Sequence, residues 1–387
     1  MDVEIDNLSL LKQEPFSEGI KQLEALMSQN NRAFLLGAGC SRCAGLPLTL
    51  ELTQIVLEKL ANSDPQANKI LKEIQEQFEG SPSATIEDYM SELVDLLAIT
   101  ERRKEQQARN SNILLNNNEY KEEELRNALD IIKETIANCI DSLKINISIH
   151  QKFVISIHKI LRSGKGETKL PVDYFVLNYD TLIEDALALE CVLYIDGFQG
   201  GTTAWWDVNT FDESNSVARV LKIHGSIDWC QFEDDIIPRR IRSGGKTYSN
   251  LCPKNKVMIW PAATKYQETQ KDPFAQILNI LRKSLRPGLH SETILAICGY
   301  RFNDSHINIE IERALLESDG RLTVLIFTEL NKPEGQIEKW HNDNSITEQI
   351  RIYAKKGFFH GSIKANSEEE LPWWKFENLV RILGGER

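Results

Sequence analysis

The amino-acid sequence predicts an α/β protein built on a Rossmann-like parallel sheet, with a large helical insertion and N- and C-terminal extensions. The segments 32–61, 171–188 and 291–318 each combine a short apolar run, a glycine or polar turn and a helix-forming stretch. Short apolar runs are typical of parallel strands that are buried on both faces. Strand, turn and helix in that order form the repeating unit of nucleotide-binding sheets. A chain of 387 residues allows one large domain or two ordinary ones.

The first 62 residues predict a helix followed by the first strand of the sheet. Residues 1–30 are expected to form an N-terminal helical arm, because Ile20, Leu23 and Met27 recur at three- and four-residue steps. This arm either packs on the domain or contacts another subunit. The apolar run 32–36 predicts a buried strand, which a glycine-rich turn and a further helix follow.

Residues 63–150 are predicted to form a helical insertion. Within it, residues 101–124 are polar and rich in asparagine, which favours an exposed loop or a frayed helix. From Leu125 to Leu143, apolar residues recur at three- and four-residue spacing, which marks a long amphipathic helix.

The second half of the chain returns to strand, turn and helix. Residues 173–177 predict a strand, and Thr181 is placed to cap the helix that follows. The run 220–223 predicts another strand directly before His224. The predicted nucleotide-binding domain comprises residues 31–62 and 151–330, and residues 331–387 are expected to pack on it as a C-terminal segment.

Composition excludes some classes of function. Lys and Arg total 45 against 57 Asp and Glu, which gives a net charge of -12 and disfavours direct binding of nucleic acid. No apolar run approaches the roughly 18 residues of a membrane span, and the N-terminus lacks a signal-peptide pattern, so we expect a cytoplasmic protein. The seven cysteines are scattered and odd in number, which is typical of reduced thiols.

Polar clusters follow several of the predicted strands. They are residues 37–41, residues 178–180, His224 with Gly225, and residues 299–304. Ligands of open parallel sheets bind outside the carboxyl ends of the strands, so we expect these clusters to converge on one ligand. The first cluster lacks the spacing G-x-G-x-x-G, which disfavours an ordinary dehydrogenase.

The order of these motifs resembles the sirtuin-like family, the NAD-consuming relatives of protein deacylases. The order is GAGxS, AGLP, NYD, HG and a late GYxFND, and the resemblance covers roughly residues 31–62 and 170–330. AGLP at 44–47 occupies the place of the family's glycine–isoleucine–proline loop. KIHGS matches the motif of the catalytic histidine, and NYD stands where deacylases carry an asparagine. The resemblance implies a sirtuin-like form of the Rossmann sheet.

The sequence also departs from the deacylases of that family. Residues 48–50 are Leu-Thr-Leu where a deacylase has Asp-Phe-Arg. Deacylases hold a structural zinc with two CxxC pairs after the histidine, whereas this chain has only Cys230 and Cys252 there. The single CxxC, Cys40 to Cys43, cannot close a four-ligand zinc shell. No zinc is therefore expected, and protein deacylation is disfavoured.

The remaining features are similar to the bacterial sirtuin-like NADases of antiphage defence. That resemblance implies an NAD+ glycohydrolase that uses NAD+ as its substrate, releases nicotinamide and ADP-ribose, and depletes NAD+ on infection. It also implies a homo-oligomer, and the chain length fits the type that works beside a HerA-type hexameric ATPase partner. The alternatives are a sirtuin-type protein deacylase or ADP-ribosyltransferase, and a non-catalytic regulatory subunit that senses NAD+ or ADP-ribose.

The resemblance and the residue chemistry together assign roles to the clusters. Asn178 is predicted to position water or the ribose hydroxyls, and His224 to act as general base, since imidazole titrates near neutral pH. Asp180 is predicted to hold the loop or to contact the nicotinamide side. The predicted NAD+-binding residues form two groups. At the pyrophosphate they are Gly37, Ala38, Gly39 and Ser41, with Cys40 and Thr49 beside them. At the adenosine end they are Gly299, Tyr300, Phe302 and Asn303.

Overall fold

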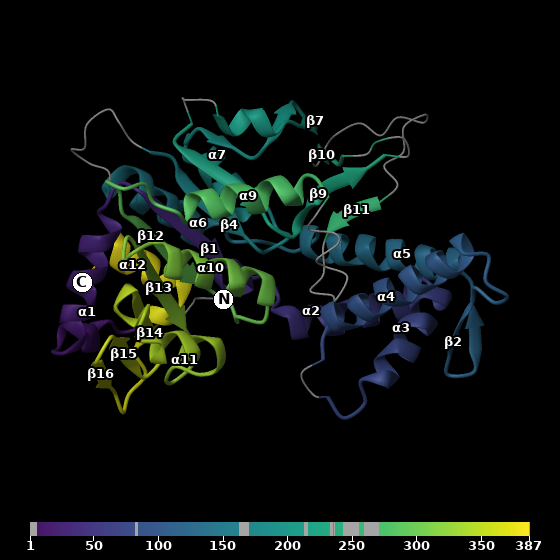
Figure 1. Ribbon diagram of the computed structural model, residues 1–387, viewed down its shortest axis with the longest axis horizontal. Helices are drawn as coiled ribbons and strands as arrows, with labels where there is room; N and C mark the ends of the chain where they lie inside the picture. Colours follow the sequence, from purple (N-terminus) through teal and green to yellow (C-terminus); the bar gives the residue numbers. More distant parts are fainter. Residues whose placement is uncertain are drawn as a thin grey trace.

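A nine-stranded sheet forms the centre of the protein (Figure 1). The computed structural model describes residues 6–81, 84–161, 170–212, 216–232, 235, 237–242, 255–258 and 271–386. The strand order is β16-β15-β14-β13-β12-β1-β4-β8-β5, with parallel pairing from β14 to β5 and antiparallel pairing at the β15 and β16 edge. The strands are β1 Arg32–Leu36, β4 Val172–Val176, β5 Tyr194–Ile195, β8 Ala218–Lys222, β12 Thr293–Cys298, β13 Leu322–Thr328, β14 Ile350–Ala354, β15 Gly357–His360 and β16 Ile363–Asn366.

Strand β1 marks the point at which the strand order reverses. It pairs in parallel with β12 on one side and with β4 on the other. The chain continues outward through β4 and β8 in one direction, and through β12, β13 and β14 in the other. This arrangement confirms the predicted α/β, Rossmann-like fold, and it places the carboxyl ends of all these strands at one edge.

Helices cover both faces of the sheet, which explains why its strands are apolar without alternation (Figure 1). Phe34 of β1 belongs to the core under one helical layer, and Leu35 belongs to the core under the other. The first layer contains α1 Phe16–Met27, α6 Ser148–Ile155, α7 Leu182–Leu189 and α12 Phe376–Leu383. The second contains α9 Phe274–Ser284, α10 Ser305–Glu317 and α11 Gly335–Asn342.

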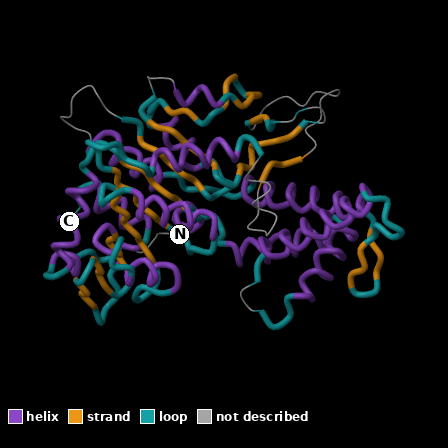
Figure 2. Tube along the Cα trace, viewed as in Figure 1, coloured by secondary structure: helices purple, strands orange, loops and turns teal. Residues whose placement is uncertain are grey.

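The helical insertion projects beyond the sheet and has a core of its own (Figures 1 and 2). It consists of α2 Thr49–Ser63, α3 Pro65–Gln77, α4 Ile86–Glu105, α5 Glu122–Asp141 and a hairpin of β2 Ile113–Leu115 with β3 Asn118–Tyr120. Helix α2 shares this core through Val56 and Leu60. Tyr179 also packs into it, so the insertion lies directly against the segment that follows β4.

The expectation of an exposed loop or frayed helix at 101–124 is correct for residues 106–112, which lie outside any helix or strand, and wrong for the rest. Helix α4 continues to Glu105, and β2 and β3 form a hairpin with the two-residue turn Asn116–Asn117. These asparagines have φ values of 41° and 70°. Asparagine tolerates the left-handed region, and two-residue hairpin turns with two positive φ values favour it.

The two ends of the chain meet on one side of the sheet. The Tyr353 hydroxyl of β14 donates to the carbonyl of Gly19 in α1 at 3.1 Å. Asp6 pairs with Lys375 at 2.9 Å and accepts from the amide of Asn378 at 2.7 Å. The N-terminal helix is therefore packed on the domain, and the C-terminal segment supplies strands β14 to β16 of the sheet.

A second, five-stranded antiparallel sheet is formed by strands that come before and after His224 in the chain (Figure 1). Its core is an aromatic cluster made of Phe198, Trp206, Phe211, Trp229 and Phe274, in which Phe198 and Trp229 lie 5.0 Å apart between ring centroids. Edge-to-face packing of large rings supplies much apolar burial in a small sheet. The strands, in spatial order, are β11 Asn255–Met258, β9 Gly225–Gln231, β10 Arg239–Ile241, β7 Thr203–Trp206 and β6 Phe198–Gly200.

Candidate functional site

The polar clusters lie together at the carboxyl edge of the parallel strands, as expected. The Gly37 amide donates to the carbonyl of Cys298 at 2.9 Å, which joins the ends of β1 and β12. The Leu177 amide donates to Leu36 at 2.9 Å, and the Ile223 amide donates to Val176 at 3.0 Å. The segments that begin at Gly37, Asn178, His224 and Gly299 therefore stand side by side.

The glycines of the first and last clusters are required by backbone packing. A Cβ on Gly37 would lie 2.4 Å from the Gly299 carbonyl oxygen, and one on Gly39 would lie 2.7 Å from the Gly299 Cα. Gly299 itself has a φ of 63°, a conformation that other residues rarely adopt. These glycines thus allow the loops after β1 and β12 to lie directly against each other.

The loop from Gly37 to Ser41 is largely closed by its own hydrogen bonds. The amides of Gly39, Cys40 and Ser41 donate to Gly299, Gly37 and Ala38 at 2.9–3.1 Å. The Ala38 amide takes part in none of these bonds, and Ala38 is exposed. A pyrophosphate at this loop would therefore contact Ala38, and it would not face a row of unbonded backbone amides.

A helix does not follow this loop at once. Two 3-10 turns, Ala38–Cys40 and Arg42–Ala44, come first, and α2 begins at Thr49 after Pro47. The positive end of the α2 dipole thus belongs to Thr49 and not to the glycine turn. The predicted roles of Thr49 and of the glycine loop in NAD+ binding remain predictions.

Asn178, Ser41 and Asp180 form a hydrogen-bonded network. The Asn178 Nδ2 donates to the Gly37 carbonyl at 3.0 Å and to the Ser41 Oγ at 2.7 Å. The Ser41 hydroxyl in turn donates to the Asp180 Oδ2 at 2.6 Å. Both of these bonds use the amide nitrogen of Asn178, and they fix how its side chain lies against the loop after β1.

Asp180, and not Thr181, provides the side-chain hydrogen bond at the start of α7. Its Oδ1 accepts from the Leu182 amide at 3.1 Å, whereas the Thr181 hydroxyl donates to the Asp185 carboxylate at 2.7 Å. Asp180 is buried, with 7% of its surface exposed. Its carboxylate thus ties the loop after β1 to the loop after β4; its predicted part in the reaction remains a prediction.

A buried ion pair lies beneath this network. The Lys222 ammonium of β8 donates to the Asp180 carbonyl and lies 3.8 Å from the Glu184 carboxylate. Burial raises the pKa of Glu184 to about 7, and the nearby Lys222 offsets only part of that shift. Removing a carboxylate from water favours its neutral form.

His224 is paired with a carboxylate that the sequence did not single out. Its Nε2 lies 2.9 Å from the Oδ2 of Asp304, the last residue of the GYRFND motif. Both residues are buried, with 9% and 6% exposed. Only the fold brings them together, since 80 residues separate them in the chain. The signal in the sequence was that both follow predicted strands.

The aromatic residues of the last cluster pack within the protein. The Phe302 ring lies 4.8 Å from Tyr300 and 5.6 Å from Trp340, between centroids. The Tyr300 hydroxyl donates to Asn308 or to the Asp304 carbonyl, each at 3.0 Å, and burial raises the pKa of Tyr300. Asn303 is exposed at the same turn. Their predicted contact with the adenosine end remains a prediction.

The thiols near the site face the interior. Cys40 is 2% exposed and its Sγ donates to the Cys298 carbonyl at 3.2 Å. Burial raises the pKa of Cys43 to about 12, so this thiol stays protonated at neutral pH. Within the described ranges no three His, Cys, Asp or Glu side chains form a group that could hold a metal ion. Cys252 lies outside the described residues.

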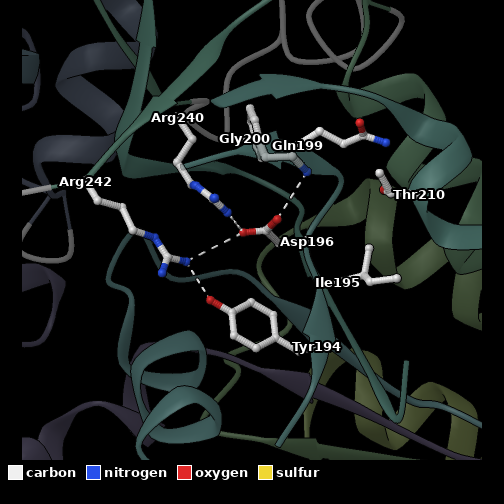
Figure 3. A pocket seen from close by; sticks show the side chains of 9 residues that line it. Tyr194, Ile195, Asp196, Gln199, Gly200, Thr210, Arg240 and Arg242 are labelled. Atoms are coloured by element: carbon white, nitrogen blue, oxygen red, sulfur yellow. Dashed lines mark hydrogen bonds and ion pairs between the residues drawn. The ribbon is translucent and has the colours of Figure 1, made fainter. Parts of the chain in front are cut away.

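A hollow of about 460 Å³ lies beside β5 and β10 (Figure 3). Figure 3 shows Arg240 and Arg242 converging on Asp196, with Tyr194 beside Arg242. Arg240 and Asp196 form a buried ion pair, and burial raises the pKa of Asp196. We call this group the arginine pocket; none of the predicted site residues lines it.

Comparison with known proteins finds a similarity to one family of domains. Residues 173–348 match the model of the SIR2-like domain, and this stretch includes Asn178, Asp180, His224 and Asp304. The match supports a sirtuin-like protein with a function that involves NAD+, because SIR2-like domains use NAD+. A search of curated proteins finds no match to the chain. Among the described helices, none has the length and apolar character that a membrane span requires.

Proposed function

We propose that this protein is an NAD+ glycohydrolase, which cleaves NAD+ into nicotinamide and ADP-ribose. The observation that carries the proposal is that Asn178, Asp180 and His224 follow two neighbouring parallel strands, β4 and β8, in a stretch that matches a SIR2-like domain. An amide oxygen, a buried carboxylate and an imidazole are then available along one edge. Such a set can orient a ribose and activate water without a metal ion.

Cleavage of this bond does not need a strong general acid. Nicotinamide in NAD+ is a cationic leaving group, so the electron pair of the broken C–N bond neutralises the pyridinium ring. Water attacks the anomeric carbon and gives its proton to a base. Asn178 is fixed through Nδ2, so its oxygen would accept from that water or from a ribose hydroxyl. His224 would take the proton, as its ordinary pKa near 6.5 allows.

Ser41 and Asp180 would act in this reaction indirectly, through Asn178. Asp180 is buried and its two carboxylate oxygens accept from Ser41 and from the Leu182 amide. Ser41 in turn holds Asn178. The pair would therefore position Asn178 and would not contact the anomeric carbon. This narrows the role predicted for Asp180 from its sequence context.

The biological role is a further part of the proposal. The motif order supports an effector of bacterial antiphage defence that depletes NAD+, and that resemblance also supports a homo-oligomer and a HerA-type hexameric ATPase as partner. Mass photometry of the purified chain, alone and with such an ATPase, tests the assembly. A monomer at every concentration, with no complex, would contradict it.

Nicotinamide release from NAD+ tests the activity. The purified protein is incubated with NAD+, with and without the candidate ATPase, and products are separated by chromatography. We expect nicotinamide and ADP-ribose in equal amounts, and loss of both in Asn178→Ala and His224→Ala. Turnover of an acyl-lysine peptide, or label transferred to protein, would favour deacylation or ADP-ribosyl transfer. NAD+ binding without any product would favour a regulatory subunit.

A further inference from the structure

We propose that Asp304 is the positioning residue of His224 and sets the nitrogen at which the imidazole takes up a proton. The Asp304 Oδ2 lies 2.9 Å from the His224 Nε2, and both side chains are buried. A carboxylate can only accept, so Nε2 carries the hydrogen and Nδ1 is the basic nitrogen. The inference rests on the proposed function, because it gives His224 the role of general base.

The carboxylate of Asp304 is held in place independently of His224. Its Oδ1 accepts from the His306 amide at 3.2 Å, as the cap of α10. The Tyr300 hydroxyl accepts from the Asp304 amide at 3.2 Å. The position of Asp304 at the start of a 13-residue helix also favours its negative charge. The acceptor is therefore in position before any ligand binds.

The pair connects opposite ends of the candidate site. His224 follows β8 and Asp304 follows β12, and the sheet order places β1 and β4 between those strands. The turn after β12 must therefore reach across the edge that carries Ser41 and Asn178. This geometry explains why Phe302 adopts a φ of 59° and why the Asn308 side chain holds the Phe302 carbonyl at 2.7 Å.

Other titratable groups face the pair. The His306 Nδ1 lies 3.7 Å from the Asp304 Oδ1, and the hydroxyls of Tyr300 and Tyr179 belong to the same surroundings. Burial raises the pKa of both tyrosines, so they stay neutral near pH 7. The charge that acts on His224 is then that of Asp304, and His306 is a second imidazole beside that carboxylate. A carboxylate beside an imidazole stabilises the imidazolium ion.

Asp304→Asn isolates the charge from the helix cap. Asparagine caps helices as well as aspartate does, so α10 keeps its start while the carboxylate is lost. We expect nicotinamide release to fall about 100-fold, within the range for a misplaced general base. The acid limb of the pH–rate profile should move to lower pH by about one unit, because His224 loses the charge that favours its protonation.

Asp64→Asn is the matched control. Asp64 caps α3 in the insertion, where its Oδ1 accepts from the amides of Gln66 and Ala67 at 3.1 and 2.8 Å. We expect this variant to keep both the rate and the pH profile. A structural role of Asp304 alone would lower the melting temperature and leave the acid limb where it was. The pH–rate profile of His306→Gln shows whether the acid limb reflects the protonation of His224 or that of His306.

Histidine NMR gives a readout that does not need turnover. Nitrogen-15 shifts of labelled imidazoles report the tautomer and the pKa of each histidine, with His224→Gln and His306→Gln for assignment. We expect His224 to carry its proton on Nε2, and its pKa to fall by about one unit in Asp304→Asn. An unchanged pKa or the opposite tautomer overturns the inference. If the shift occurs but NAD+ is never cleaved, the proposed function fails and the pairing stands.

Discussion

Two polar regions of the molecule, the arginine pocket and the candidate site, are built differently. In the arginine pocket, Asp196 pairs with Arg240 and Arg242, and Arg242 donates to the Tyr194 hydroxyl (Figure 3). In the candidate site, the side chains come from the ends of four neighbouring strands and form two hydrogen-bonded groups. The charges of the arginine pocket are therefore compensated within it, and a hollow alone does not identify the site.

The largest expected difference between the regions is in turnover. We expect His224→Ala and Asn178→Ala to lower the rate of nicotinamide release by about 10²- to 10⁴-fold, which is the usual contribution of a positioned base. Arg242→Gln should keep the rate of wild type within about two-fold. Steady-state kinetics on folded protein checks both. Loss of turnover in Arg242→Gln, with activity kept in His224→Ala, would assign the chemistry to the arginine pocket.

The arginine pocket should instead matter for stability. Asp196→Ala leaves the guanidinium of Arg240 buried without its carboxylate, which we expect to cost about 3–5 kcal/mol in the free energy of unfolding. Urea denaturation followed by tryptophan fluorescence measures it. Turnover per folded molecule should stay unchanged. A loss below about 1 kcal/mol would show that the ion pair does not hold this region together.

The glycine of the last cluster links the two loops of the candidate site. We expect Gly299→Ala to cost about 2–3 kcal/mol, because its φ is 63° and the new Cβ would lie 2.5 Å from the Cys40 nitrogen. Gly201→Ala, where a Cβ would meet nothing within 4 Å, is the control. Thermal unfolding compares them. Equal melting temperatures for the two variants would rule out the tight contact between these loops.

The smallest expected effect concerns Glu184 beneath the site. Its pKa is about 7 in the folded protein against an ordinary 4.5, so the folded state binds more protons between these values. Stability from this group is thus present below about pH 4.5 and is lost as pH rises through 7. In Glu184→Gln, the fall in the free energy of unfolding between pH 5 and 8 should be smaller than in wild type by about 2 kcal/mol. Glu58→Gln, at an exposed position of α2, is the control, and identical slopes in wild type and Glu184→Gln would refute the prediction.

The strands and motifs could be predicted from the sequence because their signals are local. The run before Gly37 is apolar throughout, and NYD and His224 follow runs of the same kind. Contacts between distant segments carry no such signal. The pairing of Asp304 with His224 depends on the strand order, and the choice of Asp180 over Thr181 at α7 depends on side-chain geometry.

Two further features were missed for physical reasons. The Asn116–Asn117 turn lies in a polar stretch, and its two strands have only three residues each, which is too short for a periodicity to reveal the hairpin. The roles of the glycines were predicted from the chemistry of a ligand, although packing between two loops already requires them. A glycine that allows close backbone approach does not reveal from sequence whether its neighbour is a phosphate or another loop.

Hydrogen–deuterium exchange with a non-hydrolysable NAD+ analogue tests the location of the site most directly. The analogue protects the backbone it covers, whether or not the isolated chain turns over. We expect slower exchange in residues 37–41, 178–182, 224–226 and 299–304, with no change in residues 194–200 and 240–242. Protection confined to the last two segments would contradict the account and would place NAD+ in the arginine pocket.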